Sequence, residues 1–154
     1  MTTESQLSAS FRDPSGFLFR QNGVLYRQVN RCYAEEYDAL VSSGLFEELC
    51  AQELLIPHRP VDVPSPVPEQ AYAIIQPDQL PFVSYPYEWC YSQLKDAAQT
   101  TLTIMLQALD HGFILKDASA YNIQFRDGRP LLIDTLSFER YRDVRRLGNQ
   151  GCTG

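Results

Sequence analysis

The sequence predicts an α+β fold, and two hairpin signals and one long helical pattern support that prediction. The first hairpin has Asn22-Gly23 between the β-rich runs 17–20 and 24–29, and the second turns at Asp127-Gly128. Both dipeptides favour the positive φ angles of a tight antiparallel turn. Between the hairpins, residues 91–111 carry apolar side chains at helical spacing. We therefore expect a small antiparallel sheet, a long helix and a second hairpin.

Composition sets the outer bounds of this fold. The chain has 154 residues, of which 44% are hydrophobic and 12% aromatic, enough for one globular core and too few for two generous domains. A net charge of −6 argues against a nucleic-acid partner, because such proteins usually carry a basic face. No apolar run approaches the ~18 residues of a membrane span, and residues 1–11 lack the apolar segment of a signal peptide. We expect a cytoplasmic protein with neither a membrane nor a nucleic-acid partner.

The cysteines give no sign of a metal cage. Cys32, Cys50, Cys90 and Cys152 are widely spaced, and no CxxC pair occurs. Zinc sites built from cysteine need closely spaced ligands, so a site of this class is not expected. An even count is compatible with disulfides, whereas a reducing cytoplasm favours the free thiols that we expect.

The first third of the chain predicts a hairpin followed by helix. Residues 1–10 are polar and predict a disordered tail. Residues 33–55 carry a helical pattern, in one or two pieces, with a break at Ser42-Ser43-Gly44. The glutamate pairs 35/36 and 47/48 fit a solvated face, although one member of the first pair could point inward to a basic side chain.

The middle of the chain predicts connectors and one short strand. Residues 57–68 hold five prolines, which indicates an extended connector with His58 on its surface. Residues 71–76 form a short apolar strand. Residues 81–89 are extended and aromatic and are interrupted by Pro86, so they suit an edge strand or a connector. Such an aromatic run serves packing or, less commonly, a ligand.

Residues 91–111 are the best helix of the sequence. Gly112 suits the left-handed position after its last turn, and His111 suits the negative end of the helix dipole. The side chains expected on one face are Leu94, Ala97, Ala98, Thr101, Leu102, Met105, Ala108 and Leu109.

The stretch 113–138 holds the candidate site and reads as strand, polar loop, strand, tight turn and strand. Asp117 and Asn122 lie in the loop, and Asp134 follows the apolar run 131–133. Two carboxylates and an amide, brought together by a hairpin, can hold a divalent cation and orient a hydroxyl, because hard cations such as magnesium choose oxygen ligands. The same spacing also fits a polar loop with ordinary turn chemistry.

The sequence LKDASAYN followed by IDTL resembles the catalytic loop and metal-binding aspartate of the protein-kinase and aminoglycoside-phosphotransferase superfamily. The resemblance implies a reduced protein-kinase-like form of the α+β fold, with ATP and magnesium as cofactors. It implies that Asp117 is the catalytic base and that Lys116 stabilises the transferred phosphoryl group. Asn122 and Asp134 would be the metal ligands.

The first half of the chain departs from that superfamily. No glycine-rich loop occurs, and no lysine precedes Lys95, so the strand lysine that holds nucleotide phosphates is missing. Arg27 is the nearest substitute for a cofactor-binding cation, with Glu35 or Glu36 as its partner, although arginine and lysine are not equivalent there. Thr135-Leu136 replaces the usual Phe-Gly after the metal-binding aspartate.

Residues 11–141 also resemble the amino-terminal region of large bacterial proteins described as SAM-dependent methyltransferases, some of them nodulation-related. The segments that carry this resemblance are FRDPSGFLFRQNGVLYRQVN and the stretch from PFVSYPYEWC to LLIDTLSFE. In that family the methyltransferase domain lies further along the chain, so SAM would bind only a domain absent here. The aperiodic tail at 142–154 suggests a truncated or frame-shifted product.

The expected domain therefore spans 11–141, with an N-lobe-like part at 11–89 and a partial C-lobe at 90–141. Three functions remain open. They are a degenerate kinase-like module that binds or scaffolds for a methyltransferase, an active phosphotransferase of small molecules that uses Asp117, and a structural domain without a ligand. Helices that normally follow the metal-binding aspartate are missing, which predicts marginal stability or self-association through the long helix.

Overall fold

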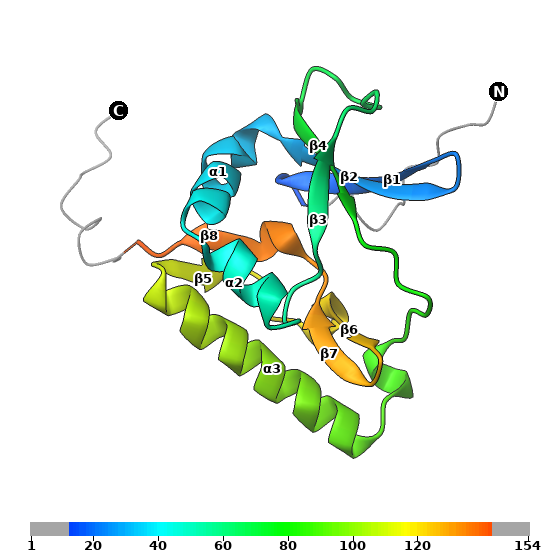
Figure 1. The fold of residues 1–154 in the computed structure, drawn as a ribbon, viewed down its shortest axis with the longest axis vertical. Coiled ribbons are helices and arrows are strands. Elements are labelled where there is room, and N and C mark those ends of the chain that lie inside the picture. The colour runs from blue at the N-terminus through cyan, green and yellow to red at the C-terminus, as the bar shows by residue number, and fades with distance from the viewer. Residues whose placement is uncertain (1–12, 143–154) are drawn as a thin grey trace, which may run out of the picture.

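A computed structural model describes residues 13–142 and shows an α+β fold built around one four-stranded antiparallel sheet and one long helix (Figure 1). The sheet stands at the top of Figure 1 and α3 runs along its lower edge, with two small two-stranded sheets between them. The α+β prediction is therefore confirmed. The predicted tail at 1–10 lies outside the described residues, as does all but the first residue of the tail predicted at 142–154.

The four-stranded sheet has the order β1-β2-β4-β3. Its first two strands are the predicted hairpin, β1 (Gly16–Gln21) and β2 (Val24–Asn30), which turns through Asn22 at φ 52° and Gly23 at φ 78°. Gly16 starts β1 where a Cβ atom would lie 2.0 Å from the carbonyl oxygen of Gln28, so only glycine fits this approach of the two strands.

Two short helices follow the hairpin, as the sequence predicts. α1 (Ala34–Ser42) and α2 (Leu45–Ala51) are separated by Ser43 and Gly44, and Gly44 adopts a φ of 82°. A 3₁₀ helix at Arg31–Tyr33 leads into α1. The fully buried side chains of Leu40, Leu45 and Leu49 join the main core of the molecule.

The proline-rich segment contains a strand that the sequence did not predict. β3 (His58–Val61) pairs with β4 (Ala71–Pro77) at the edge of the sheet. The expectation that His58 lies on the surface is also wrong. His58 is half-buried: its ring lies 4.3 Å from the ring of Phe46 between centroids, and its Nε2 lies 3.1 Å from the Tyr37 hydroxyl.

The aromatic segment before α3 is a connector and not an edge strand. It contains a 3₁₀ helix at Pro86–Glu88 and buries Trp89, whose Nε1 donates to Ser84 Oγ at 2.9 Å. The side-chain amide of Gln124 accepts from the Ser84 backbone N–H and donates to its carbonyl, each at 2.9 Å. These bonds fasten the connector to the second hairpin.

The long helix α3 (Tyr91–Asp110) is followed by His111 and then by Gly112, which adopts the predicted left-handed conformation with a φ of 81°. Its buried side chains are Ala97, Ile104 and Ala108. The inward face is rotated relative to the predicted one, because four predicted members are exposed to solvent. These are Leu94, Ala98, Leu102 and Leu109.

The end of the described chain forms two small sheets over α3. β5 (Phe113–Leu115) pairs with β8 (Phe138–Arg140), and β6 (Ile123–Arg126) pairs with β7 (Arg129–Leu132). Backbone hydrogen bonds of Leu132 with Leu54 and Ile56, at 2.8 and 2.9 Å, join this region to the segment after α2. Within residues 13–142, every helix is too short or too polar to cross a membrane.

Candidate functional site

The polar loop between β5 and β6 brings two of the predicted site residues, Asp117 and Asn122, into direct contact. Asp117 is exposed, and its Oδ1 accepts from the Ser119 backbone N–H at 2.8 Å. The side-chain amide of Asn122 donates to the Asp117 carbonyl at 3.4 Å. The backbone N–H of Ile133 donates to the Asn122 carbonyl at 2.9 Å, and Asp134 is the next residue along the chain. The loop is held by ordinary turn bonds, while the Asp117 carboxylate stays open to solvent.

Asp134 is held by a residue from the opposite part of the molecule. Its Oδ1 lies 2.9 Å from Nη2 of Arg27, which projects from β2 of the four-stranded sheet. The same oxygen accepts from the Leu136 backbone N–H at 3.1 Å, which caps the 3₁₀ helix at Thr135–Ser137. The Arg27 and Asp134 side chains are only 11% and 18% exposed, so solvent screens this ion pair weakly.

Arg27 has a second acidic neighbour and one unpaired atom. Asp13 Oδ2 lies 3.7 Å from the same Nη2, while Nε of Arg27 is buried without a hydrogen bond. A guanidinium is always charged and needs counter-charge when it is buried. Asp134 and Asp13 supply that charge, and we call these three residues the charged junction.

Lys116 points to the start of the described chain. Its Nζ donates to Ser15 Oγ at 2.9 Å and lies 4.9 Å from the centre of the Tyr33 ring, which is a cation–π contact. The Tyr33 hydroxyl donates to the Phe138 carbonyl. Burial, together with the negative charges of Asp134 and Glu36, raises the pKa of Tyr33 far above its ordinary value. Tyr33 is therefore a neutral hydrogen-bond donor.

The predicted ion pair between Arg27 and Glu35 or Glu36 does not form. Both glutamates belong to α1 and lie against Arg140 of β8, whose Nη2 is 3.5 Å from Glu35 and 3.0 Å from Glu36. The backbone N–H of Arg140 also donates to Glu36 at 2.8 Å. Burial alone would raise the pKa of Glu36, but the Arg140 side-chain and backbone hydrogen bonds lower it overall. Arg140 captures the carboxylates expected to serve Arg27.

Three contributors to this region were not singled out from the sequence. Asp13 and Ser15 lie in a segment whose Pro and Gly indicate only a turn, and Arg140 lies at the start of the charged run 140–146. Ser15 contacts Lys116, and Arg140 contacts Glu36. In each pair the two residues lie about a hundred positions apart along the chain. No local pattern could have revealed these contacts.

The arrangement of Asp134 does not suit a magnesium ion. The donor types at Asp117, Asn122 and Asp134 are those that magnesium prefers, but a guanidinium already occupies Oδ1 of Asp134. Among residues 13–142, no group of three or more acidic, histidine or cysteine side chains could hold a metal.

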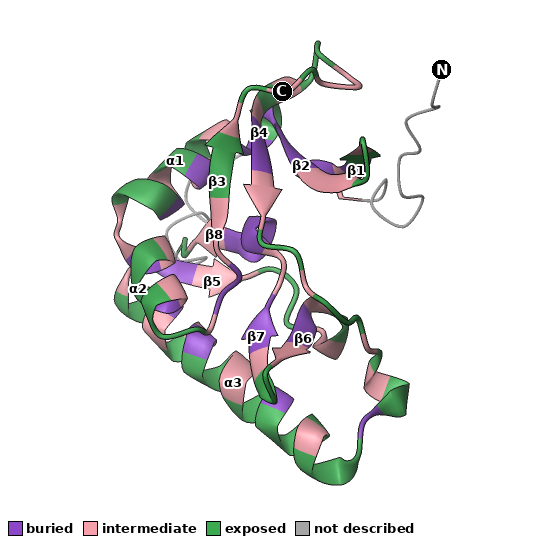
Figure 2. Ribbon diagram, turned by 45° about the vertical axis from the view of Figure 1, so that its right-hand side comes forward, coloured by how far each residue is buried: buried purple, intermediate pink, exposed green. Residues whose placement is uncertain are grey.

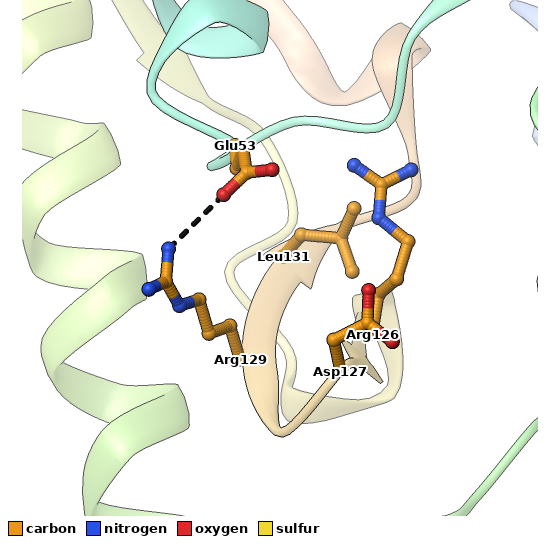
Figure 3. Close-up of a pocket in the computed structure, with 5 residues that line it drawn as sticks. All are labelled: Glu53, Arg126, Asp127, Arg129 and Leu131. Atoms are coloured by element: carbon orange, nitrogen blue, oxygen red, sulfur yellow. Dashed lines mark hydrogen bonds and ion pairs between the residues drawn. The ribbon is translucent and has the colours of Figure 1, made fainter.

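The pocket in Figure 3 lies away from these residues, beside the tip of the second hairpin. It has a volume of about 310 Å³ and is lined by Glu53, Arg126, Asp127, Arg129 and Leu131. Two of these lining residues, Arg129 and Glu53, are joined by an ion pair of 3.1 Å. A second hollow of about 330 Å³ lies beside His58 and the end of β4. Neither pocket contains a predicted site residue.

Fold and site together define a small α+β domain in which the segment after β7 is tied to the four-stranded sheet by the ion pair between Asp134 and Arg27. The chain is 35% identical over 145 residues to Nodulation protein NoeA of Rhizobium meliloti (strain 1021). The alignment takes in 90% of this chain and 29% of NoeA, so the chain spans less than a third of that relative. No family model matches the chain. The similarity supports a relationship to a nodulation protein.

Proposed function

We propose that this chain is a kinase-like binding module that does not transfer phosphoryl groups, and that it has a role related to that of NoeA. The observation that carries the proposal is the buried ion pair of 2.9 Å between Arg27 and Asp134. Metal-dependent phosphoryl transfer needs an aspartate free to hold the cation that bridges phosphate oxygens. Here an arginine takes the place of that cation.

The chemistry of arginine makes this replacement durable. The guanidinium stays charged at any ordinary pH and is less strongly hydrated than an ammonium group, so it tolerates burial better. A divalent cation at Asp134 would lie within a few ångströms of the Arg27 charge, where like charges repel strongly in a weakly screened site. Metal binding at Asp134 would therefore require Arg27 to leave.

The other positive group near the loop is also engaged. Lys116 Nζ bonds Ser15 and rests on the Tyr33 ring, so it is not directed to a phosphoryl group beside Asp117. With both cations bound internally, the region is better suited to hold the sheet against the loop than to hold a nucleotide. The methyltransferase resemblance assigns SAM chemistry to another part of a longer protein, for which this module would bind or scaffold.

One observation favours the alternative of an active phosphotransferase. The Asp117 carboxylate is exposed and adjoins Asn122, as a base that accepts a hydroxyl proton must be. In this alternative Arg27 releases Asp134 when ATP and magnesium arrive. The third alternative is a structural domain without a ligand, which should respond to neither ATP nor magnesium.

A titration separates the proposal from the active phosphotransferase. Binding of Mn²⁺, used as a spectroscopic substitute for Mg²⁺, is followed by electron paramagnetic resonance with and without ATP, beside thermal-shift scans with Mg²⁺ and ATP. We expect no protein-bound Mn²⁺ and no shift for the unaltered chain, and weak Mn²⁺ binding for Arg27→Met. Asp134→Ala in the Arg27→Met background should remove that binding. An ATP-dependent shift of the unaltered chain that Asp134→Ala abolishes would refute the proposal and support the phosphotransferase.

A further inference from the structure

Two cations from separate elements meet residues 13–15, the first residues of the described chain. Arg27 belongs to the second half of β2, which is buried (Figure 2), and its Nη2 lies 3.7 Å from Asp13 Oδ2. Lys116 follows β5, and its Nζ donates to Ser15 Oγ at 2.9 Å. Asp13 Oδ1 accepts from the Ser15 backbone N–H at 2.9 Å, which closes an Asx turn. Residues 13–15, which we call the acidic turn, therefore present a carboxylate to one cation and a hydroxyl to the other.

The backbone of the acidic turn is fixed more firmly than the Asp13 side chain. The backbone N–H of Asn30 donates to the Ser15 carbonyl at 2.8 Å, and the Asn30 side-chain amide donates to the Pro14 carbonyl at 3.0 Å. The Asp13 side chain is 32% exposed, and its distance of 3.7 Å from Arg27 is too long for a hydrogen bond. The carboxylate can therefore turn away from Arg27 at the cost of one turn hydrogen bond, while the backbone stays in place.

Both cations have bonding capacity that the acidic turn does not use. Nε of Arg27 is buried without a hydrogen bond among residues 13–142, and a buried donor without an acceptor costs free energy. Lys116 contacts only the neutral Ser15 hydroxyl and the Tyr33 ring, and it belongs to none of the ion pairs of the described residues. An oxyanion with two negative charges would satisfy Arg27 and Lys116 better than the single carboxylate of Asp13 does.

We propose that Asp13 is an internal anion that blocks an oxyanion site formed by Arg27 and Lys116, and that a phosphate-type ligand exchanges for its carboxylate. This inference rests on the proposed function, because it names a regulatory contact at the charged junction and the class of ligand that the binding module takes. Guanidinium and ammonium groups both bind phosphate oxygens, the first through its planar fork and the second as a point charge. Asp134 stays on Arg27 throughout, so the exchange needs no metal ion.

Charge determines which of the two anions occupies the site. With Asp13 in place, the two cations Arg27 and Lys116 are balanced by the two carboxylates of Asp13 and Asp134. An anion that approaches this neutral group is repelled by the Asp13 carboxylate, whereas turning Asp13 away leaves one net positive charge. The acidic turn therefore excludes weakly charged anions and admits a ligand only where its charge outweighs that of Asp13.

Isothermal titration calorimetry with inorganic pyrophosphate, in metal-free buffer of low ionic strength, tests the proposal. Asp13→Asn removes the charge and keeps an oxygen for the Ser15 N–H, so it should bind pyrophosphate at least about tenfold more tightly than the unaltered chain. Asp62→Asn is the matched control, because it removes the same charge from an exposed residue between β3 and β4, and its affinity should stay within about twofold. Adding Lys116→Gln to Asp13→Asn keeps a donor for Ser15 and should reverse the gain.

Three outcomes would overturn the proposal. They are an Asp13→Asn variant that binds no pyrophosphate, one that binds it no more tightly than Asp62→Asn does, and a gain that survives Lys116→Gln. Circular dichroism checks that each variant keeps the fold of the unaltered chain. The titration contains no metal ion, so its failure is distinguishable from failure of the proposed function, which is tested by Mn²⁺ binding to the unaltered chain.

Discussion

Two of the polar contacts between the four-stranded sheet and the rest of the molecule accommodate a buried basic side chain in different ways. At the charged junction, Arg27 keeps its charge because Asp134 and Asp13 lie beside it. At the second contact, which we call the histidine junction, His58 has Tyr37 and Phe46 as neighbours, and its Nδ1 is buried without a hydrogen bond. Arg27 therefore has acidic partners, whereas His58 lies beside two aromatic rings and a single hydroxyl group.

As a consequence, the two basic side chains differ in protonation: His58 loses its proton, whereas Arg27 keeps its charge. Burial, followed by the positive charge of Arg27, lowers the pKa of His58 to about 4. His58 is therefore neutral at neutral pH, whereas Arg27 is charged and requires its carboxylates. The comparison shows that a basic side chain buried against this sheet keeps its positive charge only where an acidic side chain lies beside it. Because Arg27 disfavours protonation of His58, the two junctions are coupled electrostatically.

The largest effect is expected from neutralising the carboxylate of the charged junction. Asp134→Asn keeps an oxygen that can accept from the Leu136 N–H, but it leaves the buried Arg27 with only the more distant Asp13. We expect a loss of about 3 kcal/mol in the free energy of unfolding, because removal of one partner strands a buried charge. Urea denaturation followed by circular dichroism measures it.

The control for this prediction is the double variant Arg27→Met with Asp134→Asn. It removes the stranded charge and should recover at least half of the lost stability, and the coupling between the two sites follows from the cycle of four proteins. A single variant within about 0.5 kcal/mol of the unaltered chain would mean that the junction behaves as a surface ion pair.

The histidine junction predicts a pH dependence of somewhat smaller size. The pKa of His58 is lowered in the folded chain, so the unfolded chain binds more protons in the range between the unfolded value near 6.5 and the folded value of about 4. The free energy of unfolding should therefore fall as pH drops through this range, by about 2 kcal/mol between pH 6.5 and 4.5. Carboxylates such as Glu36, whose pKa is also lowered, add a loss at the acidic end.

Two histidine variants isolate this effect. His58→Gln should remove most of the decline between pH 6.5 and 5, where carboxylates contribute least. His111→Gln, at the helix end beside Glu48, should leave the His58 contribution in place. Urea midpoints measured at half-unit pH steps decide the matter, and an unchanged slope in His58→Gln would show that the histidine junction admits the charged ring.

The sequence predicted those parts of the molecule that local chemistry determines. Asn22-Gly23 and Asp127-Gly128 place positive φ angles where the hairpins turn. Gly44 and Gly112 mark helix boundaries for the same reason. The spacing from Asp117 to Asn122 likewise predicted their contact, because both belong to one short loop.

The parts that it could not predict depend on distant partners. Prolines argued against a strand at β3, but Pro60 is tolerated because β3 lies at the sheet edge, where one side of the strand needs no partner. The partner of Arg27 was misassigned because Arg140, over a hundred residues away from Glu36, competes for that carboxylate. The apolar residues of α3 are numerous enough to cover more than one face, so their spacing could not distinguish the buried face of the helix from the exposed apolar side chains beside it.

The smallest effect is expected at an ion pair that matches the charged junction in distance but not in burial. Arg129 and Glu53 lie 3.1 Å apart at the rim of the pocket in Figure 3, with side chains 77% and 57% exposed. Arg129→Ala should change the free energy of unfolding by less than about 0.5 kcal/mol, because water and salt screen the pair and holding two long side chains costs entropy. The same urea denaturation as for Asp134→Asn measures it. A loss comparable to that of Asp134→Asn would show that separation alone sets the strength of these pairs, and burial would then no longer distinguish the charged junction.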